Sequence, residues 1–434
     1  MAAIAPFKGL RYNPEIISDL SSVTAPPNDR ISGEVNSQLC LKNEYNIART
    51  GFCETTDRSK APEIYKDGAA LFESWIANNI LIRDEKPAIY IYEQKFTMNN
   101  NPQSLKGIIS LVKLEDYENR VILPHQKTSR RGYKHRHSLL ESVKANISPI
   151  FSLYKDDDIS ISSLIVAHSS TKPDISFVSD EGITQNLWII DDEEFIKAMQ
   201  KKFEYKQIFI ADGHHRYETN LKYRDEMREL HPEKTDAPYD YTMMALMPMY
   251  SSGLFVLPTH RLIKGVEHFD ENLLITMMTE DFKVSKIFFT ENNYEEIITD
   301  RISGGIDEKY IGLYTGADYY YLLKPGGQFK TTLGSEAAAN SEELEATLMN
   351  SFILEKYFGF TQKQLEDTHF VTYTRSAKEA IKEVQLQNYQ CAFFLSSTKV
   401  DELRAVAEAG NMMPLKSTFF WPKTITGLVI YKFD

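Results

Sequence analysis

The stretch "FIADGHHRYETN", residues 209–220, joins an apolar run to a helical pattern and carries five ionisable side chains. A buried strand that runs directly into a helix leaves the first N–H groups of that helix pointing outward, where they favour an anion. Asp212 is placed to cap the helix, and Gly213 permits close approach of a ligand to the backbone. Arg216, in the first turn, offers a bidentate contact to phosphate. These residues predict a phosphate-binding helix start.

The two histidines of this stretch add chemistry to the predicted anion site. His214 and His215 titrate near neutral pH, so they are candidates to donate to phosphoryl oxygens or to move a proton during transfer. Adjacent helical residues do not share a face, whereas His214 and Glu218 are four residues apart and do. The HExxH pattern of zinc proteases is missing, so the sequence leaves the metal unknown.

A purely structural interpretation of the same residues stays open. In it Asp212 only caps the helix, Arg216 pairs with Glu218 or Asp225 at the surface, and the histidines satisfy backbone carbonyls.

Composition sets the class of protein. The chain has 434 residues, of which 42% are hydrophobic and 25% charged, as in a globular protein with two or three domains. A formal net charge of −12 argues against broad nucleic-acid binding. Cys40, Cys53 and Cys391 form no CxxC pair, and no leader or membrane-spanning run is evident. We therefore expect a cytoplasmic protein that binds neither membrane nor nucleic acid.

Hydrophobic periodicity and turn residues predict a mixed α/β (α+β) chain. Helices are expected over 62–80, after residue 138, over 213–230, and within 376–395 and 399–414, where Gly410 ends the last one. Strands are expected over 87–98, 105–117, before 156, within 160–200, and over 239–249 and 253–263. We expect one part over residues 1–235 and a second α+β part over 236–434.

Three further segments carry candidate functional groups. The segment 124–137, "PHQKTSRRGYKHRH", holds five Lys or Arg and three His in a predicted loop, which suggests a local anion if it is not simply solvated. In "APPNDRIS" (25–32), two prolines can hold the carboxylate of Asp29 in a fixed direction, or Asp29 stabilises the turn. Lys416, Ser417 and Thr418 can bind a second anionic group, although the glycines of a P-loop are missing. For His260 and Arg261, a structural role is an equal alternative to a site.

Two resemblances sharpen these expectations. The segment "ADGHHRYE" resembles the phosphate-contacting box of the ParB and sulfiredoxin superfamily, where such an element begins a helix and holds nucleotide phosphates. Over nearly its full length the chain resembles the bacterial and archaeal family catalogued as domain of unknown function 1015. The matching pieces are "TAPPNDRIS", "EYNIAR", "PHQKT", "ANISPIFSLY", "IADGHHRYET", "GLFVLPTHR" and "AEAGNMMPLKSTFFWPK".

The family resemblance marks individual positions. His125, Thr128 and Arg136 match family positions and become candidate phosphate contacts. Asn28 replaces a usual tyrosine, Gln126 a common glutamate and His135 a common aspartate, so the family roles of those side chains are not carried over. These departures leave room for a scaffold with a vestigial pocket.

The resemblance also implies a fold and a function. It implies a ParB/sulfiredoxin-like sheet in residues 1–235, with residues 236–434 completing the cleft. The superfamily includes free serine kinases, and family members are often encoded beside enzymes of the phosphorylated serine pathway. We therefore expect a phosphoserine phosphatase or serine kinase-like enzyme that uses Mg²⁺ and ADP, ATP or CTP. The alternatives are a non-enzymatic nucleotide-binding protein, with a homodimer as one form, and, ranked last, a nuclease.

Overall fold

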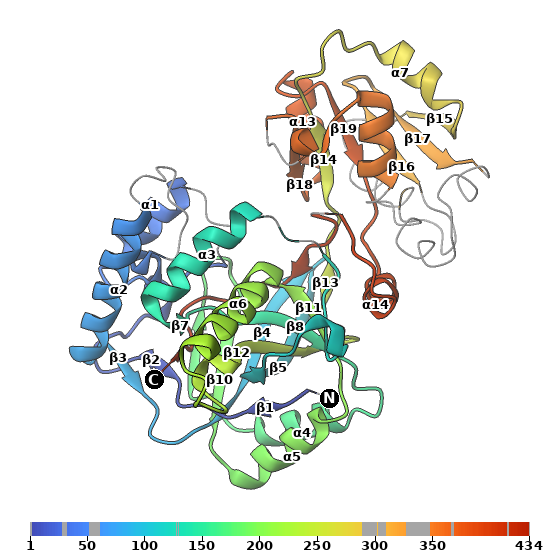
Figure 1. Ribbon diagram of the computed structural model, residues 1–434. Coiled ribbons are helices and arrows are strands. Elements are labelled where there is room, and N and C mark those ends of the chain that lie inside the picture. Colours follow the sequence, from blue (N-terminus) through green and yellow to red (C-terminus); the bar gives the residue numbers. More distant parts are fainter. Residues whose placement is uncertain are drawn as a thin grey trace. The chain divides into compact units, whose positions relative to one another are not determined.

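The computed structural model describes residues 2–27, 33–51, 61–126, 128, 130–288, 302, 310–326, 348–365, 369–414 and 416–433 (Figure 1). The contacts divide the chain into two compact units. The first unit comprises Met1–Pro124, Thr128–Phe255 and Pro422–Asp434, and the second comprises His125–Lys127 and Val256–Trp421. Each unit combines helices with a large sheet, so the chain has the mixed α/β fold predicted from its sequence.

The first unit is built on a nine-stranded mixed sheet with the order β6-β11-β8-β12-β5-β4-β10-β9, and β1 pairs with β5. Its strands are β1 (Ile4–Ala5), β4 (Ile89–Met98), β5 (Asn101–Lys113), β6 (Ile122–Leu123), β8 (Ile150–Tyr154), β9 (Ile175–Val178), β10 (Thr184–Ile190), β11 (Ile208–Asp212) and β12 (Tyr241–Pro248). The pairs β11–β6 and β12–β8 are parallel and the others antiparallel. Two small sheets pair β2 (Leu10–Tyr12) with β3 (Leu81–Arg83), and β7 (Ala145–Asn146) with β21 (Tyr431–Lys432).

The helices of the first unit pack against this sheet or against one another. They are α1 (Gly33–Lys42), α2 (Ala61–Ala77), α3 (Arg130–Val143), α4 (Ser160–His168), α5 (Glu193–Phe203) and α6 (His214–Leu230), with short 3-10 helices at Leu20–Ser22, Ile47–Thr50, Tyr117–Asn119 and Pro238–Asp240. Apolar side chains of α4 and α5, including Ile161 and Phe195, pack with the strands in one buried cluster. Figure 1 shows α3 and α6 side by side, and the contacts agree.

The second unit contains a six-stranded antiparallel sheet with the order β15-β17-β16-β19-β14-β18. Its strands are β14 (His260–Ile263), β15 (Phe282–Phe288), β16 (Ile311–Tyr314), β17 (Tyr319–Pro325), β18 (Val371–Thr374) and β19 (Cys391–Phe394), and the short strands β13 (Phe255–Val256) and β20 (Phe420–Trp421) pair separately. Its helices are α7 (Glu271–Met278), a π-helix (Leu348–Tyr357), α12 (Gln362–Leu365), α13 (Ala377–Gln385) and α14 (Val400–Glu408). Successive residues of the strands enter two different apolar clusters, Leu262 one and Ile263 the other, because side chains alternate between the faces of a sheet.

Most of the predicted elements are present. Helix α6 begins directly after Gly213 and ends at Leu230, as the sequence predicts. Gly410 has a φ of +74° just beyond α14, consistent with its predicted role as the end of that helix. Strand β12 continues the first unit beyond residue 235, where the sequence suggested a change of domain. Among the described residues, no helix combines the length and apolar character needed to cross a membrane.

The basic segment 124–137 departs from the prediction. The sequence favoured a loop throughout, but Arg130–Val143 form helix α3. Arg and Lys are good helix formers, and α3 packs against α2 and α6, so tertiary contacts outweigh the high local charge. Residues 130–137 of this segment therefore belong to a helix rather than to a loop.

Candidate functional site

The candidate site begins where β11 ends. The residues Ile208–Ala211 are buried and apolar, and the pairing of β11 with β8 shifts register between Ile210 and Asp212. Such a bulge re-aims the side chain that follows it. Gly213 then adopts φ +105° and ψ 23°, a left-handed conformation that suits glycine, and α6 starts at the next residue. The N-cap residue of α6 is Gly213, so Asp212 does not occupy the capping position that the sequence suggested.

Arg216 folds back over the helix start. Its Nη1 donates to Ser148 Oγ at 2.8 Å and to the carbonyl oxygen of Pro149 at 2.6 Å, both just before β8. Its Nη2 lies 3.5 Å from Asp212 Oδ2. A Cβ atom on Gly213 would stand 2.9 Å from Nη2 of Arg216, so the guanidinium occupies the space that a side chain would need. Arg216 is thus turned toward the helix start rather than toward Glu218 or Asp225.

A second cation reaches Asp212 from the far end of the sequence. Lys423 Nζ lies 3.4 Å from Asp212 Oδ2, and only 5% of the lysine side chain is exposed, against 27% for the aspartate. Burial raises the pKa of Asp212, but the positive charges of Lys423, Arg216 and His214 outweigh it and hold that pKa well below its usual range. Asp212 is therefore a carboxylate at neutral pH, between two cations.

A pocket of about 360 Å³ adjoins this charged group within the first unit. Its walls come from Ser21–Pro27, α1, Ser179–Glu181 and Gln185, and the segment from Lys423 to Ile425 closes it. Lys423 therefore belongs both to the ion pair with Asp212 and to the pocket wall. The volume of this pocket suits a small molecule.

Further candidate residues of the first unit lie along α3 and α6. Thr128 donates to Glu218 Oε2, and burial raises the pKa of that glutamate although the Thr128 bond opposes the shift. His214 is 4% exposed, and its charge is one of those that lower the pKa of Asp212. His215 and Arg136 are half-buried on α6 and α3. Because its pKa is raised whereas that of Asp212 is lowered, Glu218 is the stronger base of the two carboxylates and the more suitable one for proton transfer.

The other predicted phosphate contacts lie in the second unit. His125 is 1% exposed, and its Nε2 lies 3.1 Å from Thr418 Oγ1. Ser417 Oγ donates to the carbonyl oxygen of Pro414 at 2.6 Å, and Lys416 is exposed with a φ of +61°. The structure thus brings His125 and Thr418 together, although 293 positions separate them in the sequence.

The remaining residues to place are Asp29, His260 and Lys423. Asp29 lies outside the described residues, although the pocket wall includes Pro27 two positions before it. His260 is 5% exposed and its Nδ1 accepts the N–H of Leu395 at 3.3 Å, which favours the structural alternative for that histidine. Lys423 is the last residue of the matching piece "AEAGNMMPLKSTFFWPK", but nothing local in the sequence marks it as the partner of Asp212.

The fold and the charged junction define a mixed α/β protein with a candidate anion-binding site in its first unit. The chain belongs to the family described as "Protein of unknown function (DUF1015)", whose model matches residues 4–378. No curated protein matches the chain.

Solved structures show weak likeness to the chain. A conserved hypothetical protein from Pyrococcus furiosus has 12% identity and a TM-score of 0.35, covering 73% of this chain and 92% of its own. A free serine kinase in complex with AMP has 12% identity and a TM-score of 0.35, covering 72% and 86%. SbnI with a C-terminal truncation, from Staphylococcus aureus, has 11% identity and a TM-score of 0.34, covering 73% and 85%.

Proposed function

We propose that the first unit binds the phosphoryl group of a small metabolite or nucleotide at the junction of β11 and α6 and catalyses its transfer or hydrolysis. The observation that carries this proposal is the position of Lys423, which pairs with the ionised Asp212 at 3.4 Å and also lines the adjoining pocket. A buried ammonium at the wall of a pocket is a suitable partner for a phosphorylated ligand.

The chemistry of phosphoryl transfer agrees with the groups present. Such transfer needs positive charge and positioning more than a covalent intermediate. Lys423 and the start of α6 supply positive potential, and Arg216 holds the junction in place through Ser148, Pro149 and Asp212. The candidate ADGHHRYE box of the ParB/sulfiredoxin type, with Gly213 at its turn, is part of this proposal.

Asp212 and Glu218 have different proposed roles. A carboxylate with a strongly lowered pKa is a weak base, so Asp212 orients the attacking hydroxyl or water, or holds Mg²⁺ together with phosphate oxygens. A carboxylate oxygen is a ligand that Mg²⁺ accepts, so the residue fits this ion. Glu218, whose pKa burial raises, is the candidate proton acceptor, and His214 and His215 are candidate proton donors to the leaving oxygen.

Phosphoserine hydrolysis or serine phosphorylation from ADP or ATP is the leading specific reaction. In hydrolysis, a water oxygen bonds to phosphorus, the ester P–O bond breaks, and the serine oxygen leaves with a proton. In the kinase direction, the serine oxygen bonds to the terminal phosphorus of ADP or ATP, the bridging P–O bond breaks, AMP or ADP leaves, and the base takes the hydroxyl proton. Thr128 and Arg136 of the first unit stay proposed contacts for phosphate oxygens, and His125, Lys416, Ser417 and Thr418 of the second unit stay proposed contacts for a separate anionic group.

One observation favours a second candidate, a non-enzymatic nucleotide-binding protein. Arg216 Nη1 is satisfied by two protein acceptors, Ser148 Oγ and the Pro149 carbonyl, as in a site that holds its shape without turnover. In this version CTP, ADP or ATP binds the first unit and remains intact.

An activity screen separates the two candidates. The purified full-length chain is incubated with phosphoserine, with serine plus ADP or ATP, and with CTP, each with Mg²⁺ and with EDTA. If the protein is an enzyme, we expect phosphate release or transfer with one of these substrates. Arg216→Ala should lower this activity about tenfold or more, because it removes the ion pair with Asp212 and the hydrogen bonds to Ser148 and Pro149. If nucleotide binds with no turnover on any substrate, the binding protein is the correct version. If the wild-type chain and the variant behave alike throughout, both versions lose their support.

A further inference from the structure

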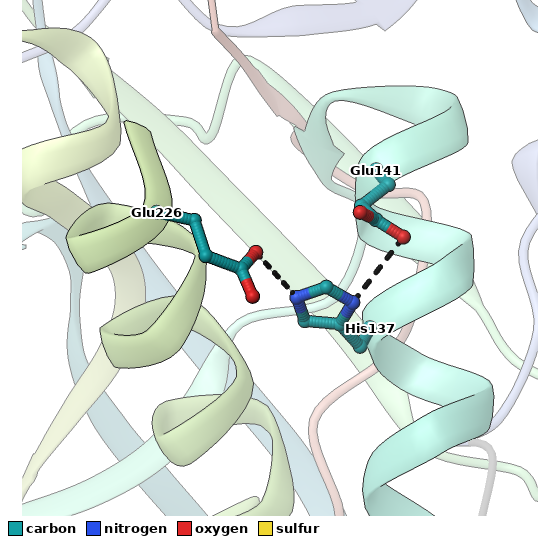
Figure 2. A group of neighbouring side chains, drawn as sticks. All are labelled: His137, Glu141 and Glu226. Atoms are coloured by element: carbon teal, nitrogen blue, oxygen red, sulfur yellow. Dashed lines mark hydrogen bonds and ion pairs between the residues drawn. The ribbon is translucent and has the colours of Figure 1, made fainter. Parts of the chain in front are cut away.

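A histidine lies between two carboxylates where α3 meets α6. His137 Nδ1 is 3.2 Å from Glu141 Oε2, one turn later on α3, and His137 Nε2 is 2.8 Å from Glu226 Oε2 on α6. Figure 2 shows the imidazole ring between the two carboxylates, with one ring nitrogen directed at each. The three possible ligand atoms lie within 4.8 Å of one another.

The chemistry of imidazole limits what this arrangement can be. A neutral imidazole carries one N–H, so only one of the two close contacts is a hydrogen bond. The other brings a nitrogen lone pair against a carboxylate oxygen, which is repulsive unless a proton or a metal ion lies between them.

We propose that this group is a binding site for a transition-metal ion of the Zn²⁺ class, held directly by His137 Nε2 and the carboxylate of Glu226. Glu141 accepts the N–H of Nδ1 and orients the ring, an arrangement typical of histidine ligands. Zinc binds nitrogen at about 2.0–2.1 Å and carboxylate oxygen at about 2.0–2.2 Å, so the 2.8 Å gap has to widen by a few tenths of an ångström. The mixed nitrogen and oxygen ligands disfavour Mg²⁺, which prefers oxygen alone.

The surroundings suit a bound cation that water can reach. The exposed fractions of the side chains are 13% for His137, 52% for Glu141 and 37% for Glu226, so water can complete the coordination. Tyr223 nearby has a raised pKa because it is buried and because the charges of Glu141, Tyr239 and Glu226 oppose its ionisation, which indicates negative potential at this place. Lys222 Nζ lies 3.5 Å from Glu226 Oε1, which is not the carboxylate oxygen that contacts His137.

A metal here joins two helices that are distant in sequence. His137 and Glu141 belong to α3 and Glu226 to α6, the helix that begins at the proposed phosphate site. The ion therefore stabilises the packing of α3 on α6, and its role does not depend on the proposed reaction.

Titration calorimetry of the full-length chain with ZnCl₂, in a buffer that does not chelate metals, tests the proposal. We expect a Zn²⁺ binding event in the wild-type chain that is lost in His137→Ala, with affinity at least tenfold weaker in the nearly isosteric Glu226→Gln. Glu141→Ala is expected to weaken binding about 10–100-fold, as is usual when the partner that orients a histidine ligand is removed. His231→Ala is the matched control, because it removes a more exposed histidine just beyond the same helix, and it should bind as the wild type does.

Thermal unfolding gives a second measurement on the same proteins. Zn²⁺ should raise the Tm of the wild-type chain and of His231→Ala but not that of Glu226→Gln, whereas any rise with Mg²⁺, which Asp212 is proposed to hold, should be equal in all three proteins. Circular dichroism establishes that each variant is folded. Equal Zn²⁺ affinity in the wild type, His137→Ala and Glu226→Gln would overturn the proposal and leave His137 as a structural contact between α3 and α6.

Discussion

Gly213 is the residue that allows β11 to turn directly into α6. Its φ of +105° costs any other residue about 1–2 kcal/mol, and a Cβ would also crowd the guanidinium of Arg216. Gly182, with a φ of +74° and no atom within 4 Å of its would-be Cβ, carries only the first of these penalties. The two glycines therefore separate backbone strain from the effect on Arg216.

We predict that Gly213→Ala and Gly182→Ala each lower the free energy of unfolding by about 1–2 kcal/mol, measured by urea denaturation. Only Gly213→Ala should also weaken phosphate binding, because it displaces Arg216 from Asp212. If Gly213→Ala binds phosphate as tightly as Gly182→Ala does, the position of the guanidinium does not matter for the site.

Single residues were predictable from the sequence only where the signal is local. The turn at Gly213 follows from an apolar strand meeting a helical pattern. The partners of Arg216 at Ser148 and Pro149, and the pairing of Asp212 with Lys423, depend on how distant segments meet in the folded chain. No spacing rule in a single sequence gives such contacts.

At the scale of elements, α6 is held by a polar inner face. Asn146 on β7 donates to Asn220 Oδ1 on α6 at 3.0 Å and accepts the N–H of Met243 on β12 at 2.9 Å. Asn220 in turn donates to the carbonyl oxygen of Arg216 at 2.7 Å. These bonds connect the helix of the candidate site to two strands. Hydrophobic periodicity could not reveal this, because the buried residues of α6 are largely polar.

We predict that Asn146→Ala lowers the free energy of unfolding by about 2–4 kcal/mol, since it leaves the buried Met243 N–H and Asn220 Oδ1 without these partners. Asn78→Ala is the matched control, because it removes an exposed side-chain bond to the Ser74 carbonyl and should change stability by less than about 0.5 kcal/mol. Equal stability of the two variants in urea denaturation would show that the polar network does not hold α6.

At the scale of the whole molecule, the C-terminal segment of the chain completes the first unit. Residues Pro422–Asp434 return to it, with β21 paired to β7 and Lys423 beside Asp212. The mixed α/β class and most elements could be predicted, since each depends on local patterns. The return of the tail could not, because it results from long-range strand pairing.

The free energy of unfolding should depend on pH because His260, in the second unit, is buried. Burial, with a contribution from Arg261, lowers the pKa of His260 from 6.5 to about 4. Below pH 6.5 the unfolded chain binds a proton that the folded chain does not, so stability falls as the pH decreases from 6.5 toward 4. Between pH 7.5 and 5, this residue should cost the folded state about 2 kcal/mol.

Urea denaturation of the wild type and His260→Asn at these two pH values measures this effect. The asparagine oxygen can accept the Leu395 N–H but does not titrate, so the variant should lose about 2 kcal/mol less than the wild type on acidification. An identical loss in both proteins would assign the acid sensitivity to other groups.

We propose that Lys423 and the start of α6 bind a phosphoryl group. The most direct measurement is a titration with inorganic phosphate followed by ³¹P line broadening, on the wild type, Lys423→Met and the exposed control Lys197→Met. We expect saturable phosphate binding by the wild type and by Lys197→Met. The affinity of Lys423→Met for phosphate should be about tenfold or more weaker, because a charged hydrogen bond is lost. Equal phosphate binding by all three proteins, or none by the wild type, would contradict it.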